Sequence, residues 1–220
     1  MIALPFRFKV TNMNTAQIFK FLQEQIHTVV MATTDDAGNP VTCAIDIMDS
    51  DDKALYFLTA KGKNFYKRLK NRLYVSLTGI KGQSTMQRIA VSVQGKIREC
   101  DHNILLRLLE KNPYMFEIYP TEQSREGLSA FMIYSGNGEW FDLSKKPIER
   151  IDFTFGITRQ LRDGYFISEK CNGCGNCLFV CPQKCIDTSC CPAIIKQEHC
   201  LHCGNCKTAC PVLAVERRTI

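Results

Sequence analysis

The chain has 220 residues and is 45% hydrophobic, which is enough for one or two domains with a buried core. It contains no run of 18 apolar residues and opens on MIALPFRFKV, which lacks a secretory signal pattern, so we expect a cytoplasmic protein with no membrane partner. The formal net charge of +6 counts all thirteen cysteines as neutral and falls if thiolates bind metal, so we expect no nucleic-acid partner either.

The first predicted elements are a helix and two hairpins. Residues 15–26 (TAQIFKFLQEQI) place apolar side chains four positions apart behind a polar capping residue, which predicts a helix. The β-branched segment 28–34 and the segment 41–48 flank the turn sequence DDAGNP and predict a hairpin. Residues 54–59 (ALYFLT) predict the next strand, paired with 41–48 in a second hairpin.

Strands and helices continue through the middle of the chain. The predicted elements are a short basic helix at 62–70, strands at 72–80 and 86–98, and a helix that Asp101 caps and Pro113 ends. Two more strands, 128–135 and 139–143, are predicted to pair across a turn at Gly136-Asn137-Gly138. Six or so strands with regular turns and peripheral helices indicate a small β-barrel in an α+β fold.

This first domain is predicted to span residues 1–145. A linker or docking segment, 146–167, follows it. In this segment Ile151, Phe153 and Phe155 alternate with polar residues, which predicts a further short strand that docks the C-terminal tail onto the barrel.

The last predicted domain, 168–220, carries a repeated cysteine pattern. Residues 171–182 (CNGCGNCLFVCP) and 200–211 (CLHCGNCKTACP) share the motif C-x2-C-x2-C-x3-C-P, lie 29 positions apart and are identical at seven of twelve positions. In such pairs each motif supplies three ligands to one 4Fe–4S cluster and its fourth cysteine to the other cluster. We therefore expect two 4Fe–4S clusters with these ligand sets: Cys171, Cys174, Cys177 and Cys210; and Cys200, Cys203, Cys206 and Cys181.

Other interpretations of the cysteines are weaker. Structural zinc sites usually combine two well-separated C-x2-C pairs, and disulfides need an oxidising compartment. Cys185 occupies the repeat position that Ala214 holds in the second motif, so we expect a small side chain packed near a cluster. The region from about 168 to 218 resembles bacterial-type two-cluster ferredoxins.

The first domain resembles the pyridoxamine 5′-phosphate oxidase-like flavoproteins over roughly residues 10–145. The resemblance rests on the opening helix, the hairpin TVVMATTDDAGNPVTCAIDIM and the stretch ALYFLTAKGKNFYKRLKNRLYVSL. It implies an FMN-binding split β-barrel in which a strand-end threonine and the following basic residues hold the FMN phosphate. By match these are Thr59, Lys61 and Lys63, whose hydroxyl and ammonium groups suit a phosphate dianion at a helix N-terminus.

The same resemblance suggests contacts to the flavin ring. The strand at 43–48 would line the ring through Cys43 and Ala44, and Arg88 and Gln94 could reach it from a later strand. Barrel strands also expose such residues without any ligand. Cys43 and Met48 stand where the oxidase uses basic residues, which argues against vitamin B6 phosphate as the substrate.

The sequence therefore predicts an iron–sulfur flavoprotein with two 4Fe–4S clusters and FMN. We expect an oxidoreductase that takes electrons from, or gives them to, a redox partner protein and reduces a small organic acceptor. The resemblance also implies a homodimer with FMN at the subunit interface. Two alternatives remain open: a redox carrier or sensor without turnover, and a ferredoxin fused to a barrel that does not bind FMN.

Overall fold

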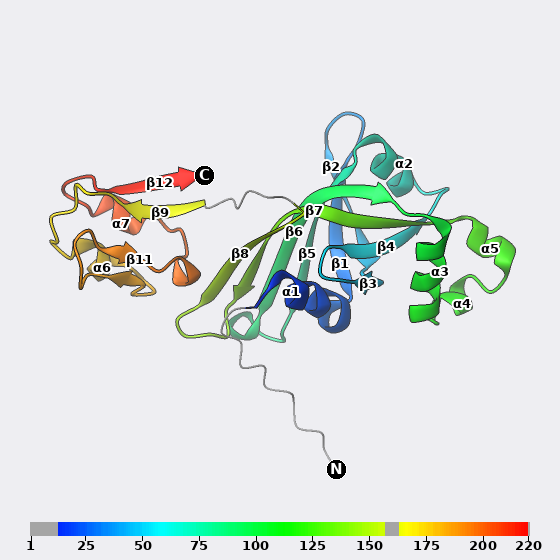
Figure 1. Cartoon of the computed structure of the whole chain (residues 1–220), viewed down its shortest axis with the longest axis horizontal. Helices are drawn as coiled ribbons and strands as arrows, with labels where there is room; N and C mark the ends of the chain where they lie inside the picture. The colour runs from blue at the N-terminus through cyan, green and yellow to red at the C-terminus, as the bar shows by residue number, and fades with distance from the viewer. Residues whose placement is uncertain (1–12, 157–162, 220) are drawn as a thin grey trace, which may run out of the picture.

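The main sheet is antiparallel and curls into a half-barrel, with a smaller cysteine-rich region beside its β8 edge (Figure 1). The computed structural model describes residues 13–156 and 163–219. The MIALPFRFKV opening and the part of the predicted linker at 157–162 lie outside the described residues. None of the helices within the described ranges is long and apolar enough to cross a membrane.

The helical elements are α1 (Thr15–Phe21), a π-helical segment (Leu22–Ile26), α2 (Asn64–Asn71), a 3-10 turn (Thr85–Gln87), α3 (His102–Lys111), α4 (Met115–Ile118), α5 (Glu122–Glu126), α6 (Asn176–Val180), a second 3-10 turn (Gln197–His199) and α7 (Asn205–Thr208). The strands are β1 (Thr28–Thr34), β2 (Pro40–Asp46), β3 (Asp49–Ser50), β4 (Leu55–Ala60), β5 (Tyr74–Lys81), β6 (Ile89–Glu99), β7 (Leu128–Asp142), β8 (Glu149–Phe155), β9 (Asp163–Ile167), β10 (Ile186–Asp187), β11 (Ile194–Ile195) and β12 (Val215–Thr219).

The strand order of the main sheet is β2-β1-β5-β6-β7-β4-β3, with β8 paired to β7. Side chains alternate between buried and exposed along β5 and β6, so one face of the sheet forms the core. Helix α1 closes this core, because Phe19 packs edge-on against Phe155 of β8 with ring centroids 4.9 Å apart. Helix α3 covers a second apolar cluster on the other side of β4.

Most predicted elements are confirmed, with local changes. Helix α1 begins at a capping box in which Asn14 accepts from the Gln17 backbone N–H. Its last five predicted residues form the π-helical segment instead of a regular α-helix. Asp101 caps α3 as predicted, through the Ile104 N–H.

The hairpin predicted across Gly136-Asn137-Gly138 is wrong, because β7 runs without a break from Leu128 to Asp142. These glycines allow close strand approach and do not form a turn. A Cβ on Gly136 would collide with the Gln94 carbonyl of β6, and one on Gly138 would collide with the Phe153 ring of β8. The glycines therefore let this part of β7 lie tightly between β6 and β8.

The predicted pairing of 41–48 with 54–59 is also wrong. Strand β2 pairs with β1, whereas β4 pairs with β7 and with the two-residue β3. The reason is burial on both faces of β4, where Phe57 belongs to the main core and Tyr56 to the cluster under α3. An interior position between β7 and β3 satisfies both faces.

The segment 146–167 contributes to two sheets. Its predicted strand exists as β8 and pairs with β7, so Ile151, Phe153 and Phe155 lie on the barrel. Its last residues form β9, which pairs with the C-terminal β12 in a separate two-stranded sheet. In the cysteine-rich region α6 and α7 begin after Gly175 and Gly204, both with positive φ, a conformation that favours glycine.

Candidate functional site

The cysteines of the two motifs surround two separate pockets. Every predicted member of the first ligand set lines one pocket: Cys171, Cys174, Cys177 and Cys210. Every predicted member of the second set lines the other: Cys181, Cys200, Cys203 and Cys206. The fourth cysteine of each motif thus lies in the pocket of the other motif. Four thiols around one pocket form a donor set that suits a 4Fe–4S cluster.

The two pockets differ in exposure. Three thiols of the second set, Cys181, Cys200 and Cys206, are buried, whereas those of the first set are partly or fully exposed. The buried Cys185 lies with its sulfur 3.5 Å from that of Cys181. A hydrogen bond with Cys185, the His202 backbone N–H and the Arg150 charge lower the pKa of the Cys200 thiol to about 6, although burial opposes them.

Thr59 is the best-placed candidate of the barrel. It is the penultimate residue of β4, is 3% exposed, and its Oγ1 has no hydrogen-bond partner among the described residues. A buried hydroxyl without a partner is costly, so a ligand oxygen there would stabilise it. Helix α2 begins five residues later, behind Lys63, which provides no side-chain cap for the helix N-terminus. These features fit a bound phosphate group such as that of FMN.

The neighbouring cations have distinct contacts. Lys61 donates from Nζ to the Glu126 carbonyl at 2.9 Å, which ties the loop to α5. The charges of Arg68 and Lys63 reach the Cys43 thiol, whose pKa is nevertheless raised because burial outweighs them. Arg68 was not among the predicted site residues. The only sequence feature that could have indicated it is its place among the basic residues of 61–72. In the structure Arg68 donates from Nε to Thr33 Oγ1 of β1, 2.8 Å away.

The other predicted flavin contacts are not brought together. Cys43 packs against the core and Ala44 is exposed, because consecutive side chains of β2 point to opposite faces. Arg88 is exposed at the start of β6. Gln94 is exposed too, and its side chain is hydrogen-bonded to Asn137 of β7. Thr59 lies opposite Ser129 of the same strand. Ser129 and Asn137 are eight residues apart, which is roughly 26 Å along a straight strand, so Gln94 lies far from Thr59.

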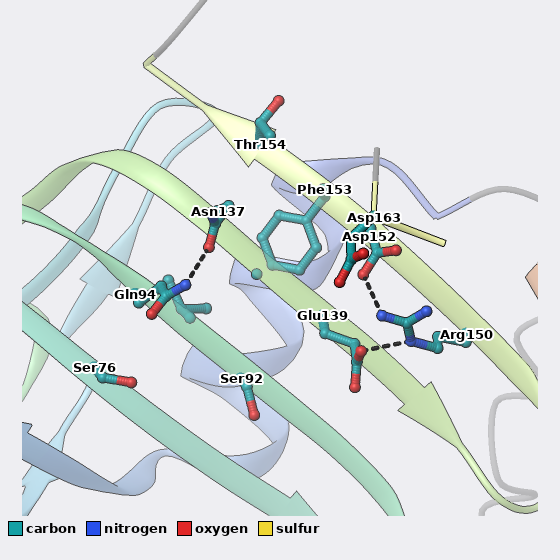
Figure 2. Close-up of a pocket in the computed structure, with 12 residues that line it drawn as sticks. Ser76, Ser92, Gln94, Asn137, Glu139, Arg150, Asp152, Phe153, Thr154 and Asp163 are labelled. Carbon is teal, nitrogen blue, oxygen red and sulfur yellow. Dashed lines mark hydrogen bonds and ion pairs between the residues drawn. The ribbon is translucent and has the colours of Figure 1, made fainter. Parts of the chain in front are cut away.

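Gln94 lies in a polar pocket of about 470 Å³ on the outer face of β5–β8 (Figure 2). Its labelled lining side chains are Ser76, Ser92, Gln94, Asn137, Glu139, Arg150, Asp152, Phe153, Thr154 and Asp163. Arg150 lies between two carboxylates, with Nε 2.5 Å from Glu139 Oε2 and Nη2 3.0 Å from Asp152 Oδ1. Burial raises the pKa of Asp152, and Arg150 opposes that shift. The sequence did not indicate this pocket, because its residues come from five strands, β5 to β9.

The curled sheet, its covering helices and the paired cysteine pockets define a split barrel joined to a ferredoxin-type region. The sequence profile of the pyridoxamine 5′-phosphate oxidase family matches residues 15–133, and the chain belongs to this family. A 4Fe–4S binding domain profile matches residues 165–187 and 193–216. Both assignments confirm the resemblances and support a role in redox chemistry.

Solved structures show the same barrel fold at low identity. A NimC/NimA family protein from Clostridium acetobutylicum has TM-score 0.52 and 17% identity, covering 63% of this chain and 90% of that chain. A conserved hypothetical protein from Mycobacterium tuberculosis has TM-score 0.51 and 21% identity, covering 62% of this chain and 89% of that chain. A heme binding protein from Mycobacterium smegmatis has TM-score 0.52 and 11% identity, covering 66% of this chain and 60% of that chain. No curated protein matches the chain.

Proposed function

We propose that the protein is an iron–sulfur flavoprotein that passes electrons between two 4Fe–4S clusters and FMN and reduces a small organic acceptor. One observation carries this proposal: a single chain combines two pockets, each lined by the four cysteines expected for one cluster, with a buried threonine that has no described hydrogen-bond partner and precedes a helix in a barrel of this family. When bound, the clusters would exchange single electrons, and FMN would accept single electrons and deliver two.

The chain's own residues supply binding and orientation. The two thiol sets would hold the clusters as assigned from the motif. Thr59 would donate its hydroxyl to the phosphate, and Lys63 with the first N–H groups of α2 would neutralise the phosphate charge. Lys61 is tied to Glu126, so its part would be to shape the loop.

A second copy of the chain is part of the proposal. Large apolar side chains are exposed on the outer face and edges of the sheet, among them Val30 at 56%, Tyr74 at 49% and Ile80 at 57%. Exposed apolar side chains on a sheet face favour association, and a symmetric dimer would cover them on both chains. Sedimentation of the loaded protein tests this. A stable 25.0 kDa monomer that retains one FMN per chain would contradict the dimer.

The cofactors are tested on anaerobically purified protein, with iron, sulfide and flavin quantified beside the ultraviolet–visible spectrum. We expect about eight irons and one FMN per chain. A heme spectrum would overturn the FMN assignment, and a barrel without any flavin would favour the fused-ferredoxin alternative.

Catalysis is tested separately. The loaded protein is reduced with dithionite, freed of excess reductant and mixed anaerobically with small quinone, nitro and carbonyl compounds. Reoxidation of the flavin with matching loss of the acceptor supports the oxidoreductase. Reoxidation only by a redox protein would favour the carrier alternative.

A further inference from the structure

The two cluster loops carry different residues at the third position of the motif. The third residue of the first motif is Gly173, with φ +74°, whereas the third residue of the second motif is His202, with φ +52°. Positive φ is uncommon for residues other than glycine and persists where surrounding contacts hold the backbone. The second loop therefore carries a side chain in a conformation that the first loop leaves to glycine.

One polar contact of the His202 ring comes from the barrel. Nη1 of Arg150 in β8 lies 2.7 Å from Nε2 and 3.1 Å from Nδ1 of His202. The Arg150 side chain is only 13% exposed, so this contact is shielded from water. The same guanidinium pairs with Glu139 and Asp152, as Figure 2 shows. Arg150 thus joins the polar pocket of the barrel to the loop between Cys200 and Cys203.

Two more hydrogen bonds cross the same interface. His199 donates from Nδ1 to the Ile148 carbonyl at 3.0 Å, and the Ile148 N–H donates to Gln183 Oε1 at 2.9 Å. His199 precedes Cys200, and Gln183 follows the Cys181-Pro182 pair. These side-chain hydrogen bonds between the barrel and the cysteine-rich region involve sequence neighbours of the second ligand set.

We propose that Arg150 is a positioning residue that acts across the two parts of the chain: it holds the second cluster loop against the barrel and raises the reduction potential of that cluster. The proposal rests on the clusters of the proposed function and not on FMN. Reduction of a 4Fe–4S cluster adds one negative charge, which a nearby shielded cation stabilises. The raised potential favours transfer of one electron from the reduced first cluster to the oxidised second cluster, and this transfer forms and breaks no bond and moves no proton.

Opposing influences act at the same place. Burial of Cys181, Cys200 and Cys206 disfavours added negative charge and lowers the potential of the second cluster. Glu139 and Asp152 partly neutralise Arg150. The proposal therefore concerns the change on removing each charge, and it gives that change a sign: loss of Arg150 lowers the potential, and loss of Glu139 raises it.

The test is a redox titration of the loaded protein followed by electron paramagnetic resonance. Signals are assigned to each cluster with Cys174→Ser and Cys203→Ser, one exposed ligand from each set. Arg150→Gln should lower the ratio of reduced second cluster to reduced first cluster about tenfold, which corresponds to a fall of about 59 mV in the potential of the second cluster for one electron. Glu139→Gln should raise this ratio, and Arg150→Lys should retain most of the wild-type potential of the second cluster.

The matched control is Arg98→Gln, which removes one exposed arginine charge from β6, where Arg98 lies over the Tyr134 ring. It should shift neither cluster. His202→Gly copies the first loop and should weaken the docking contact, seen as faster amide exchange at Gln197–His199. Equal shifts of both clusters, or no shift in Arg150→Gln and Glu139→Gln, would overturn the inference. Wild-type protein without clusters would instead overturn the proposed function.

Discussion

The barrel and the cysteine-rich region are stabilised by different means. The barrel buries a continuous core in which Phe19, Phe57 and Phe131 are fully inaccessible to solvent. Among its described residues the cysteine-rich region has a small core of nine buried residues, four of which are cysteines. Burial can stabilise the first part alone, whereas so small a region depends on metal ligation. The comparison teaches that removing metal and altering the barrel should act on separate parts of the chain.

The largest expected effect is the loss of the clusters. Iron removal by oxidation and chelation should unfold β9–β12, because no comparable core remains, and should leave the barrel folded. Hydrogen exchange measures this, with the amides of β5 and β6 as the internal control. Retained protection of the β9–β12 pairing after iron removal would show that burial suffices there.

The second prediction concerns the crossover within the cysteine-rich region. Cys181→Ser should destroy the cluster of Cys200, Cys203 and Cys206 and spare the cluster of the motif in which Cys181 lies, because its side chain lines the other pocket. Iron content should fall from about eight to about four per chain, and spectroscopy should show which cluster remains. Loss confined to the first motif's cluster would contradict the assignment.

The third prediction tests the barrel as a binding frame. Lys63→Glu should weaken FMN by about 1.5–3 kcal/mol while riboflavin changes little, since only FMN loses a charge-assisted phosphate contact. Calorimetry with both ligands measures the difference. Lys67→Glu, an exposed position inside helix α2 that Lys63 precedes, is the matched control and should have a smaller effect. Equal weakening of both ligands would mean that Lys63 supports the fold.

The smallest effect is a pH-dependent one in the barrel. Burial would raise the pKa of Glu99, but hydrogen bonds from Lys70 at 2.7 Å, from Ser129 and from Tyr66 lower it overall. A lowered folded pKa means that Glu99 stabilises the fold above its unfolded pKa, about 4.3, and that this stability is lost as pH falls through the folded value.

Glu99→Gln should therefore reduce the free energy of unfolding at pH 7, and the gap to wild type should close as pH drops below about 4.3. Urea unfolding of the barrel at several pH values measures the gap. A gap that does not change with pH would assign the effect to packing and not to the carboxylate charge.

Local patterns predicted much of the fold because their causes are local. Cap residues such as Asn14 and Asp101 act on N–H groups three positions away, so the sequence alone reveals them. The prediction of strand pairing was wrong where the pairing depends on segments that are far apart in the sequence. Gly136 and Gly138 looked like a turn because their backbone freedom is visible in sequence, whereas the strands that crowd them are not.

The candidate sites divide in the same way. Cysteine spacing by itself determined the two cluster loops, because three ligands two residues apart need only a short chain to reach one cluster. The alternation of β2 placed Cys43 and Ala44 on opposite faces, and strand length separated Gln94 from Thr59. Only the tertiary structure decided that Thr59 Oγ1 is buried without a described partner and that Arg150 meets His202, because burial and contacts between distant segments depend on the packing of the whole chain.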